Sequence, residues 1–168
     1  MRININNTSS HIKLNKKKKN AIIHCVEFVL MEERSKGNRL FSRFLKKVDL
    51  HDMLVDLLFV DDKEIIKLNK KYFNSPEPTD VVAFSMIEGE VMESNRSIGE
   101  AVICIQTAKR NAGIFGQTFE EELFLLIIHA VLHLTGYEHN NEKGIMRRKE
   151  KIYLNYIKKE VIPVYLAG

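Results

Sequence analysis

The most regular hydrophobic pattern lies between residues 118 and 135 and predicts a helix with a clearly marked start. Thr118 and Glu121 stand at capping-box spacing, so each side chain can bind the other's backbone N–H. From Leu123 to Leu134 every residue is apolar except two histidines. A helix that is apolar on all sides is buried, and this one is too short to cross a membrane, which takes about 20 apolar residues. We therefore expect a central core helix.

Shorter patterns predict about four strands and further helices. Apolar or alternating runs indicate strands at residues 2–6, 54–60, 80–86 and 98–105, with a hairpin connection at 88–97. Helical spacing indicates helices at 20–31, from a cap at Asp61 or Asp62 to about residue 72, at 106–112, and after residue 139. Turns are expected at 34–38 and 74–79. No repeat or linker divides the chain, so we expect a single domain over residues 1–168. Its fold class is α+β, with a single mixed sheet of about four strands and packed helices.

Three histidines in the spacing H-x-x-x-H-x-x-G-x-x-H indicate a metal site formed by His129, His133 and His139. Residues four apart share one face of a helix, so His129 and His133 can reach one point. Gly136 is expected to end the helix, which lets the chain turn and bring His139 back to the same point. The alternative without a metal is a pair of core histidines that are hydrogen-bonded to other protein groups. One apolar helix face rarely supplies hydrogen-bond partners for both.

Three neutral imidazoles with an open fourth position are the geometry of a catalytic zinc site. We therefore predict one zinc ion per chain on a His-bearing core helix, a zincin-like arrangement. Iron, nickel or copper would also accept three imidazoles. Cys25 and Cys104 lie far apart and are expected to be reduced thiols. Cys104 is expected to pack in its strand rather than to serve as a fourth ligand.

The same histidine spacing occurs in the metzincin proteases, whose pattern is H-E-x-x-H-x-x-G-x-x-H. Ala130 stands where those proteases carry the glutamate that serves as general base. Glu121, Glu122 and Glu138 cannot replace it, because they do not share its place on the helix face. The sequence therefore disfavours a peptidase mechanism, and a bound metal must activate water with other help.

Composition and charge indicate in which compartment the protein works and what class of partner it binds. Of the 168 residues, 45% are hydrophobic and 29% are charged, an ordinary globular balance. The absence of an 18-residue apolar run and of a signal-peptide pattern predicts a cytoplasmic protein with no membrane contact. The net charge of +4 is compatible with an RNA partner. We expect the lysine run at residues 13–19 to be a solvated face. The basic run at 147–151, close to the metal motif, is expected to contact phosphate.

Three sequence blocks carry a resemblance to a known family. The first is Leu-Asn-Lys-Lys-Tyr at 68–72 with Pro-Thr-Asp-Val-Val-Ala-Phe-Ser at 78–85. The second runs from Ile-Gly-Glu-Ala at 98–101 to Ala-Lys-Arg at 108–110 and Gly116. The third is the histidine motif. Together they span roughly residues 54–157 and resemble the YbeY endoribonuclease family of bacterial rRNA maturation factors, whose motif reads H-G-x-L-H-L-x-G-Y-D-H.

The resemblance implies a single-strand-specific, zinc-dependent endoribonuclease. It implies the 16S rRNA precursor as substrate during 3′-end maturation, a part in ribosome quality control, and contact with the small ribosomal subunit. His129, His133 and His139 match the zinc ligands of the family. Ala130 replaces a glycine, and Glu138 replaces an aspartate and keeps its charge.

Phe73 is the departure that bears most on activity. The family usually has an arginine directly after the tyrosine, and that arginine is thought to contribute to RNA cleavage. A phenylalanine cannot contact a phosphate ionically, although it can stack on a base. Lys109 and Arg110 are the nearest motif-borne cations that could replace the arginine, and solvent-facing helix positions are an equally good interpretation of them. The candidate catalytic residues are therefore His129, Lys109 and Arg110.

The sequence leaves two further points open. Asp80 is either a hydrogen-bond acceptor for a ligand histidine or a turn contact beside Thr79. The metal would lower the pKa of its bound water and polarise a phosphoryl oxygen, and either hydroxide or the RNA 2′-hydroxyl would attack phosphorus. Three function classes remain: a metal-dependent endoribonuclease, which we favour, a metallohydrolase of another substrate, and a metal-binding ribosome-assembly factor that does not cut RNA.

Overall fold

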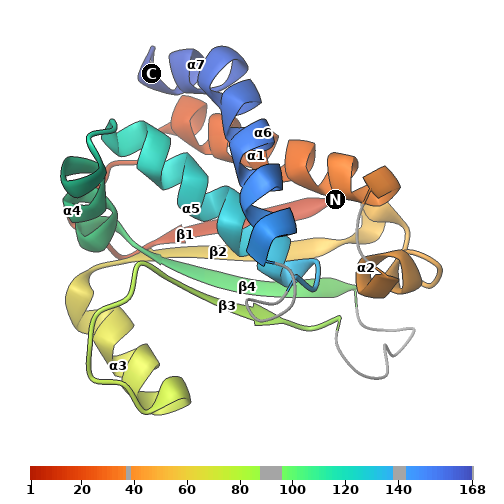
Figure 1. Ribbon diagram of the computed structural model, residues 1–168, viewed down its shortest axis with the longest axis horizontal. Helices are drawn as coiled ribbons and strands as arrows, with labels where there is room; N and C mark the ends of the chain where they lie inside the picture. Colours follow the sequence, from red (N-terminus) through yellow and green to blue (C-terminus); the bar gives the residue numbers. More distant parts are fainter. Residues whose placement is uncertain (37–38, 88–95, 138–142, 168) are drawn as a thin grey trace.

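Four strands form one mixed sheet: β1 (Arg2–Asn7), β2 (Leu54–Val60), β3 (Val81–Ser85) and β4 (Ser97–Cys104). The spatial order is β1-β2-β4-β3, with β1, β2 and β4 parallel and β3 antiparallel to β4 at one edge (Figure 1). This computed structural model describes residues 1–36, 39–87, 96–137 and 143–167. The predicted mixed sheet is confirmed, and β3 and β4 pair as the predicted hairpin requires. Residues 88–95 of the expected connection lie outside the described residues.

The helices cover the two faces of the sheet unequally. They are α1 (Lys16–Lys36), α2 (Arg39–Phe44), α3 (Asp62–Phe73), α4 (Ile105–Phe115), α5 (Phe119–Leu134), α6 (Lys143–Glu160) and α7 (Ile162–Leu166), with a 3₁₀ turn at Leu50–Asp52. Figure 1 shows α1, α4, α5, α6 and α7 on one side of the sheet and α3 alone on the other. The turn expected from residue 34 is wrong up to residue 36, because α1 continues to Lys36. Helices α2 and α7 had no counterpart in the sequence prediction.

Alternate residues of the strands pack into two separate hydrophobic cores. In β4, Ala101 and Ile103 point into the main core below α1 and α5, whereas Val102 and Cys104 pack in a small core with Ile65 of α3. This alternation follows from the two-residue period of a strand. The edge strand β3 is divided in the same way, and its neighbours on the two sides are α5 and α3. The edge of the sheet therefore lies between these two helices.

Helix α5 forms as its sequence predicts. The capping box is confirmed: the Thr118 hydroxyl accepts from the Glu121 N–H at 3.1 Å, and the Glu121 carboxylate accepts from the Thr118 N–H at 3.2 Å. Ten of its residues are buried, and it packs against α1, α4, α6 and the sheet. After the helix, Gly136 has a positive φ of 96°, a conformation that glycine adopts without steric cost. The predicted core helix and its glycine stop are therefore confirmed.

The close approach of β3, β4 and α5 depends on Gly99. This glycine has a φ of 140°, and a Cβ atom there would lie 2.1 Å from the carbonyl oxygen of Phe84 and 2.8 Å from a methyl carbon of Leu134. Nearby, the Ser85 hydroxyl on β3 donates to the Leu134 carbonyl at the end of α5, at 3.1 Å. These contacts fix the distance between the edge strand and the histidine-bearing helix.

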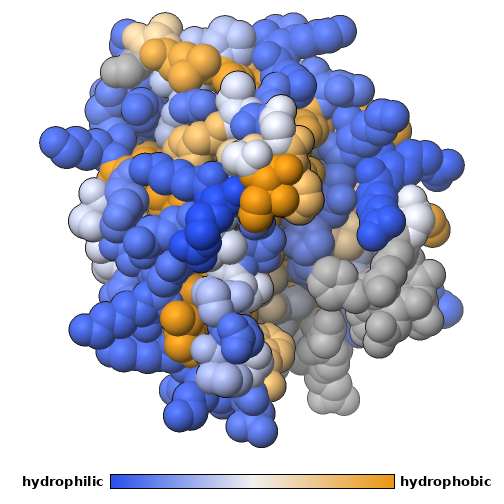
Figure 2. Space-filling view, turned by 60° about the vertical axis from the view of Figure 1, so that its left-hand side comes forward, coloured by the Kyte–Doolittle hydropathy of each residue, from blue (hydrophilic) through white to orange (hydrophobic). Residues whose placement is uncertain are grey.

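The visible surface is mainly hydrophilic. Figure 2 shows a face on which apolar side chains form small, separate patches among polar ones. Within the described residues, no helix is both long enough and apolar enough to cross a membrane.

Candidate active site

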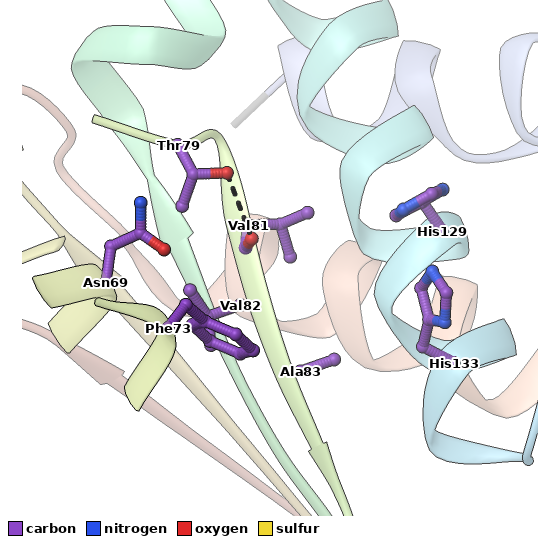
Figure 3. A pocket seen from close by; sticks show the side chains of 8 residues that line it. All are labelled: Asn69, Phe73, Thr79, Val81, Val82, Ala83, His129 and His133. Atoms are coloured by element: carbon purple, nitrogen blue, oxygen red, sulfur yellow. Dashed lines mark hydrogen bonds between the residues drawn. The ribbon is translucent and has the colours of Figure 1, made fainter. Parts of the chain in front are cut away.

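His129 and His133 lie side by side on α5, as their spacing predicts. Their ring centroids are 4.6 Å apart, and both side chains are half-buried. Figure 3 shows both rings on the side of α5 that faces β3. His139, the third predicted ligand, lies outside the described residues. Among the residues that are described, no three His, Cys, Asp or Glu side chains come together as a metal-binding group.

Each of the two rings is held through its Nδ1 atom. Nδ1 of His133 lies 2.6 Å from the backbone carbonyl oxygen of Tyr137, and Nδ1 of His129 lies 2.8 Å from a carboxylate oxygen of Glu150. A carbonyl or an ionised carboxylate only accepts, so Nδ1 carries the proton and Nε2 of the neutral ring carries the lone pair. Metal-binding histidines typically donate their second N–H to such an acceptor. The two residues therefore fit a metal site with Nε2 as the ligand atom.

Sequence reasoning missed Glu150 and considered Asp80 in its place. The side chain of Asp80 accepts hydrogen bonds from Thr79 at 3.4 Å and from Asn111 at 3.3 Å, which agrees with the turn-contact interpretation, and His139, its other possible partner, lies outside the described residues. Glu150 left a signal in the sequence that could have identified it. It lies at helical spacing between Met146 and Tyr153, both buried on the inner side of α6. A carboxylate on an apolar stripe needs a partner, and here the partner is a histidine.

A pocket of about 290 Å³ opens beside the two histidines. It runs around the edge strand β3, from α5 on one side to the C-terminal part of α3 on the other (Figure 3). Its lining consists of Asn69, Phe73, Thr79, Val81, Val82, Ala83, His129 and His133. This size is at the lower end of ligand pockets, which run from about 300 Å³. Phe73, the residue in place of the family's arginine, therefore lies in the same pocket as the histidine pair.

The structure does not bring Lys109 or Arg110 into this pocket. The guanidinium of Arg110 donates two hydrogen bonds to the Asp62 carboxylate, at 2.7 and 3.0 Å, and it lowers the pKa of Asp62. The ammonium of Lys109 donates to the His11 carbonyl at 2.9 Å. Cys104 is buried at the end of β4 and donates to Asp62, away from the histidines. Lys109 and Arg110 therefore bind other parts of the protein and do not line the pocket in which a phosphate would lie.

The basic run at residues 147–151 contains one side chain that packs inward and three that are exposed. The side chain of Lys149 is only 13% exposed and forms a 2.8 Å ion pair with Glu33, a fully buried carboxylate of α1. Glu33 also accepts from Tyr137 at 2.8 Å and from Tyr153 at 2.5 Å. Burial, and then the bond to Glu33, raise the pKa of Tyr153, so its hydroxyl remains a donor. The prediction that the whole run contacts phosphate is therefore wrong for Lys149, because packing turns it inward.

Glu33, Tyr137, Lys149 and Tyr153 form a hydrogen-bonded cluster that contacts the histidine pair. Tyr137 joins the two, since its hydroxyl donates to Glu33 while its backbone carbonyl accepts from His133. Tyr137 is thereby tied to α1, and through Glu33 to Lys149 and Tyr153 of α6. Rigid support of this kind is what a preorganised ligand set requires.

The family model and the two relatives described next carry the same family name. A protein-family model described as "Endoribonuclease YbeY" matches residues 4–158. An endoribonuclease YbeY of Pelotomaculum thermopropionicum is 45% identical over 102 residues, which are 58% of this chain and 67% of that protein. One of Clostridium botulinum is 32% identical over 169 residues, covering 89% of this chain and 93% of the other. The solution structure of TM1509 from Thermotoga maritima covers 95% of this chain and 91% of its own, with a TM-score of 0.60 and 26% identity.

Proposed function

Because the chain belongs to the YbeY endoribonuclease family, we propose that it is a zinc-dependent endoribonuclease that cuts single-stranded RNA in the pocket between α5 and β3. One zinc ion per chain would be held by His129, His133 and His139. The observation that supports this most strongly is the histidine pair on one face of α5, each ring bonded through Nδ1.

In the proposed mechanism, each residue of the chain has a limited task. Zinc held by the three histidines would supply a water of lowered pKa and a Lewis acid for a phosphoryl oxygen. Glu150 keeps the proton of His129 on Nδ1, and the Tyr137 carbonyl does the same for His133. Val81 and Ala83 of β3 form an apolar wall opposite the histidines (Figure 3).

The cellular part of the proposal rests on the family resemblance. The substrate would be the 16S rRNA precursor during 3′-end maturation, with contact to the small ribosomal subunit and a part in ribosome quality control, all in the cytoplasm. Arg147, Arg148 and Lys151 are exposed on α6, three or fewer residues from Glu150, and are the candidates for phosphate contact in this region.

A second candidate function follows from Phe73. No Lys or Arg among the described residues lines the pocket, so the charge that the family's arginine would bring to a phosphate is missing there. This observation favours a metal-binding ribosome-assembly factor that does not cut RNA. A peptide hydrolase is the third candidate, and Ala130 argues against it.

One set of assays separates the three candidates. The purified protein is incubated with single-stranded RNA from the 16S 3′ region, with duplex RNA and with unstructured peptide, in the presence and absence of a zinc chelator. Cleavage of the single-stranded RNA alone, lost with the chelator, is the expected result. Bound zinc without RNA cleavage would support the assembly factor, and cleavage of peptide would support the third candidate.

Elemental analysis tests the metal site independently of activity. His133→Ala should lose its zinc, while His51→Ala, at an exposed position far from α5 in the chain, should keep about one per chain. Full zinc retention in His133→Ala would contradict the assignment of the ligands.

A further inference from the structure

An exposed aromatic ring on one side of the pocket is unusual enough to need an explanation. Phe73 is 56% exposed and Tyr72, its neighbour at the end of α3, is 52% exposed. Burial of such rings stabilises a fold, so rings left in water at the rim of a cavity favour a ligand that covers them. We refer to Tyr72, Phe73 and Phe84 as the aromatic shelf.

Within the shelf, Phe84 contacts both exposed rings. Phe84 of β3 stacks on Phe73 with ring centroids 6.4 Å apart and planes 20° apart, and it meets Tyr72 edge to face at 4.9 Å. Helix α3 ends at Phe73 and is capped by Asn74, whose left-handed conformation (φ 55°) lets its N–H bind the carbonyl of Asn69. The ring of Phe73 is therefore supported on one side by Phe84, while more than half of its surface remains open to solvent.

A polar group stands beside the ring. The amide nitrogen of Asn69 donates to the Glu77 carbonyl at 2.8 Å, which fixes the orientation of the side chain. Its oxygen is then directed towards β3 and the pocket (Figure 3). Each nucleobase carries an N–H donor on its edge and an apolar face, so a base lying on Phe73 could donate to this oxygen.

The aromatic shelf lies across the edge strand from the two histidines. Phe73 and the histidine pair line one pocket from opposite sides of the edge strand, with Val81 and Ala83 between them (Figure 3). A nucleotide has the same two parts, a flat base and a phosphate, separated by one sugar. Lys71 adds a cation on the outer side, with Nζ 4.9 Å from the centre of the Tyr72 ring. Such alternation of stacking surface and positive charge is characteristic of sites for single-stranded nucleic acid.

We propose that Phe73 and Asn69 form a nucleobase subsite, in which Phe73 stacks on an unpaired base next to the phosphate that faces His129 and His133. The proposal rests on the proposed function, because it takes single-stranded RNA as the substrate of the pocket. The subsite also gives a reason for single-strand specificity. A base within a duplex has both faces covered by its neighbours, so it cannot lie on Phe73 unless it is first unstacked.

Fluorescence titration of the zinc-loaded protein tests the subsite. The probe is a short single-stranded RNA that carries one 2-aminopurine, whose fluorescence falls on stacking, and that is protected from cutting by 2′-O-methyl and phosphorothioate groups. Binding should quench the fluorescence, and Phe73→Leu should bind on the order of 10-fold more weakly with less quenching. Phe73→Trp should bind at least as tightly as the wild type. Phe115→Leu, which alters a phenylalanine at the end of α4 that is even more exposed than Phe73, should bind like the wild type.

A double-mutant cycle that combines Phe73→Leu with removal of the base tests whether the two are in direct contact. Replacing the 2-aminopurine by an abasic site should weaken binding to the wild type but cause little further loss in Phe73→Leu, because the two changes remove the same contact. Equal binding and quenching by wild type and Phe73→Leu would overturn the subsite, and so would additive losses in the cycle. If both proteins still cut single-stranded RNA in that case, the proposed function stands without the subsite. A wild type that holds zinc but binds no single-stranded RNA would overturn both.

Discussion

Nδ1 of His129 on α5 lies 2.8 Å from Oε1 of Glu150 on α6 and is the contact that orients the first histidine of the pair. Removing such an acceptor typically lowers metal affinity by about 10- to 100-fold, because the ring loses its orientation and its basicity. Glu150→Ala should therefore weaken zinc binding by that factor, measured by competition with a chelating dye. Glu150→Gln keeps a carbonyl acceptor and should lose less. Glu160→Ala, at the exposed end of the same helix, serves as the control. Wild-type affinity in Glu150→Ala would refute the role.

The ion pair between Lys149 and Glu33 should matter for stability. Lys149→Met leaves a fully buried carboxylate without its cation, which typically costs about 3–5 kcal/mol. Arg148→Met, next to it but exposed, should change the free energy of unfolding by no more than about 0.5 kcal/mol. Urea denaturation of the two variants measures both values. Equal losses would mean that Lys149 is a surface residue after all.

Two glycines should respond to alanine in opposite directions. In Gly99→Ala the new Cβ meets the Phe84 carbonyl oxygen, and the φ of 140° is strained for alanine, so we expect a loss of at least about 2 kcal/mol in stability. Gly113 lies within α4, with nothing within 4 Å of the Cβ position. Gly113→Ala should stabilise by about 0.5–1 kcal/mol, since alanine has the higher helix propensity. Thermal or urea unfolding of both variants checks the sign of each change.

Arg110 should affect stability at neutral pH and not the rate of RNA cleavage. Its hydrogen bonds lower the folded-state pKa of Asp62. A lowered carboxylate pKa stabilises the fold above the unfolded-state value of about 3.9, and this contribution is lost as the pH falls through the lower folded-state value. Arg110→Ala should therefore be less stable than the wild type at pH 7, by about 1 kcal/mol for this partly exposed pair, and the difference should vanish in acid. A variant with wild-type stability but slow cleavage would restore Arg110 as a catalytic candidate.

Phe73→Arg tests what the family's arginine contributes. Within the described residues no cation lines the pocket, so the new guanidinium would be the first positive side chain in the lining of the pocket itself. A preorganised charge contact of this kind is worth up to about 100-fold in rate, and arginine can still stack on a base. We therefore expect faster cleavage of single-stranded RNA in a single-turnover assay. Phe73→Lys, with the same charge but no flat surface, is the matched control. An unchanged rate in both variants would show that charge at this position does not limit cleavage.

The sequence by itself determined those features that depend on neighbours along the chain. Helix α5, its capping box and the shared face of His129 and His133 follow from spacings of three and four residues, which a helix converts directly into contacts. The strands follow in the same way from apolar runs and alternation. Helices α2 and α7 were not predicted, because helices of six and five residues have little stability of their own and form only against a core.

Only the tertiary structure decided which polar side chains work together. The sequence contains Glu150, Lys149 and Arg110 without indicating a partner for any of them. The partners are His129, Glu33 and Asp62, at separations of 21, 116 and 48 residues. Such pairings depend on how α6 packs across α1 and α5 and on how α4 meets α3. Hydrophobic burial, which has no direction, brings these helices together, and the hydrogen bonds and ion pairs then form between whichever polar groups packing has placed within reach.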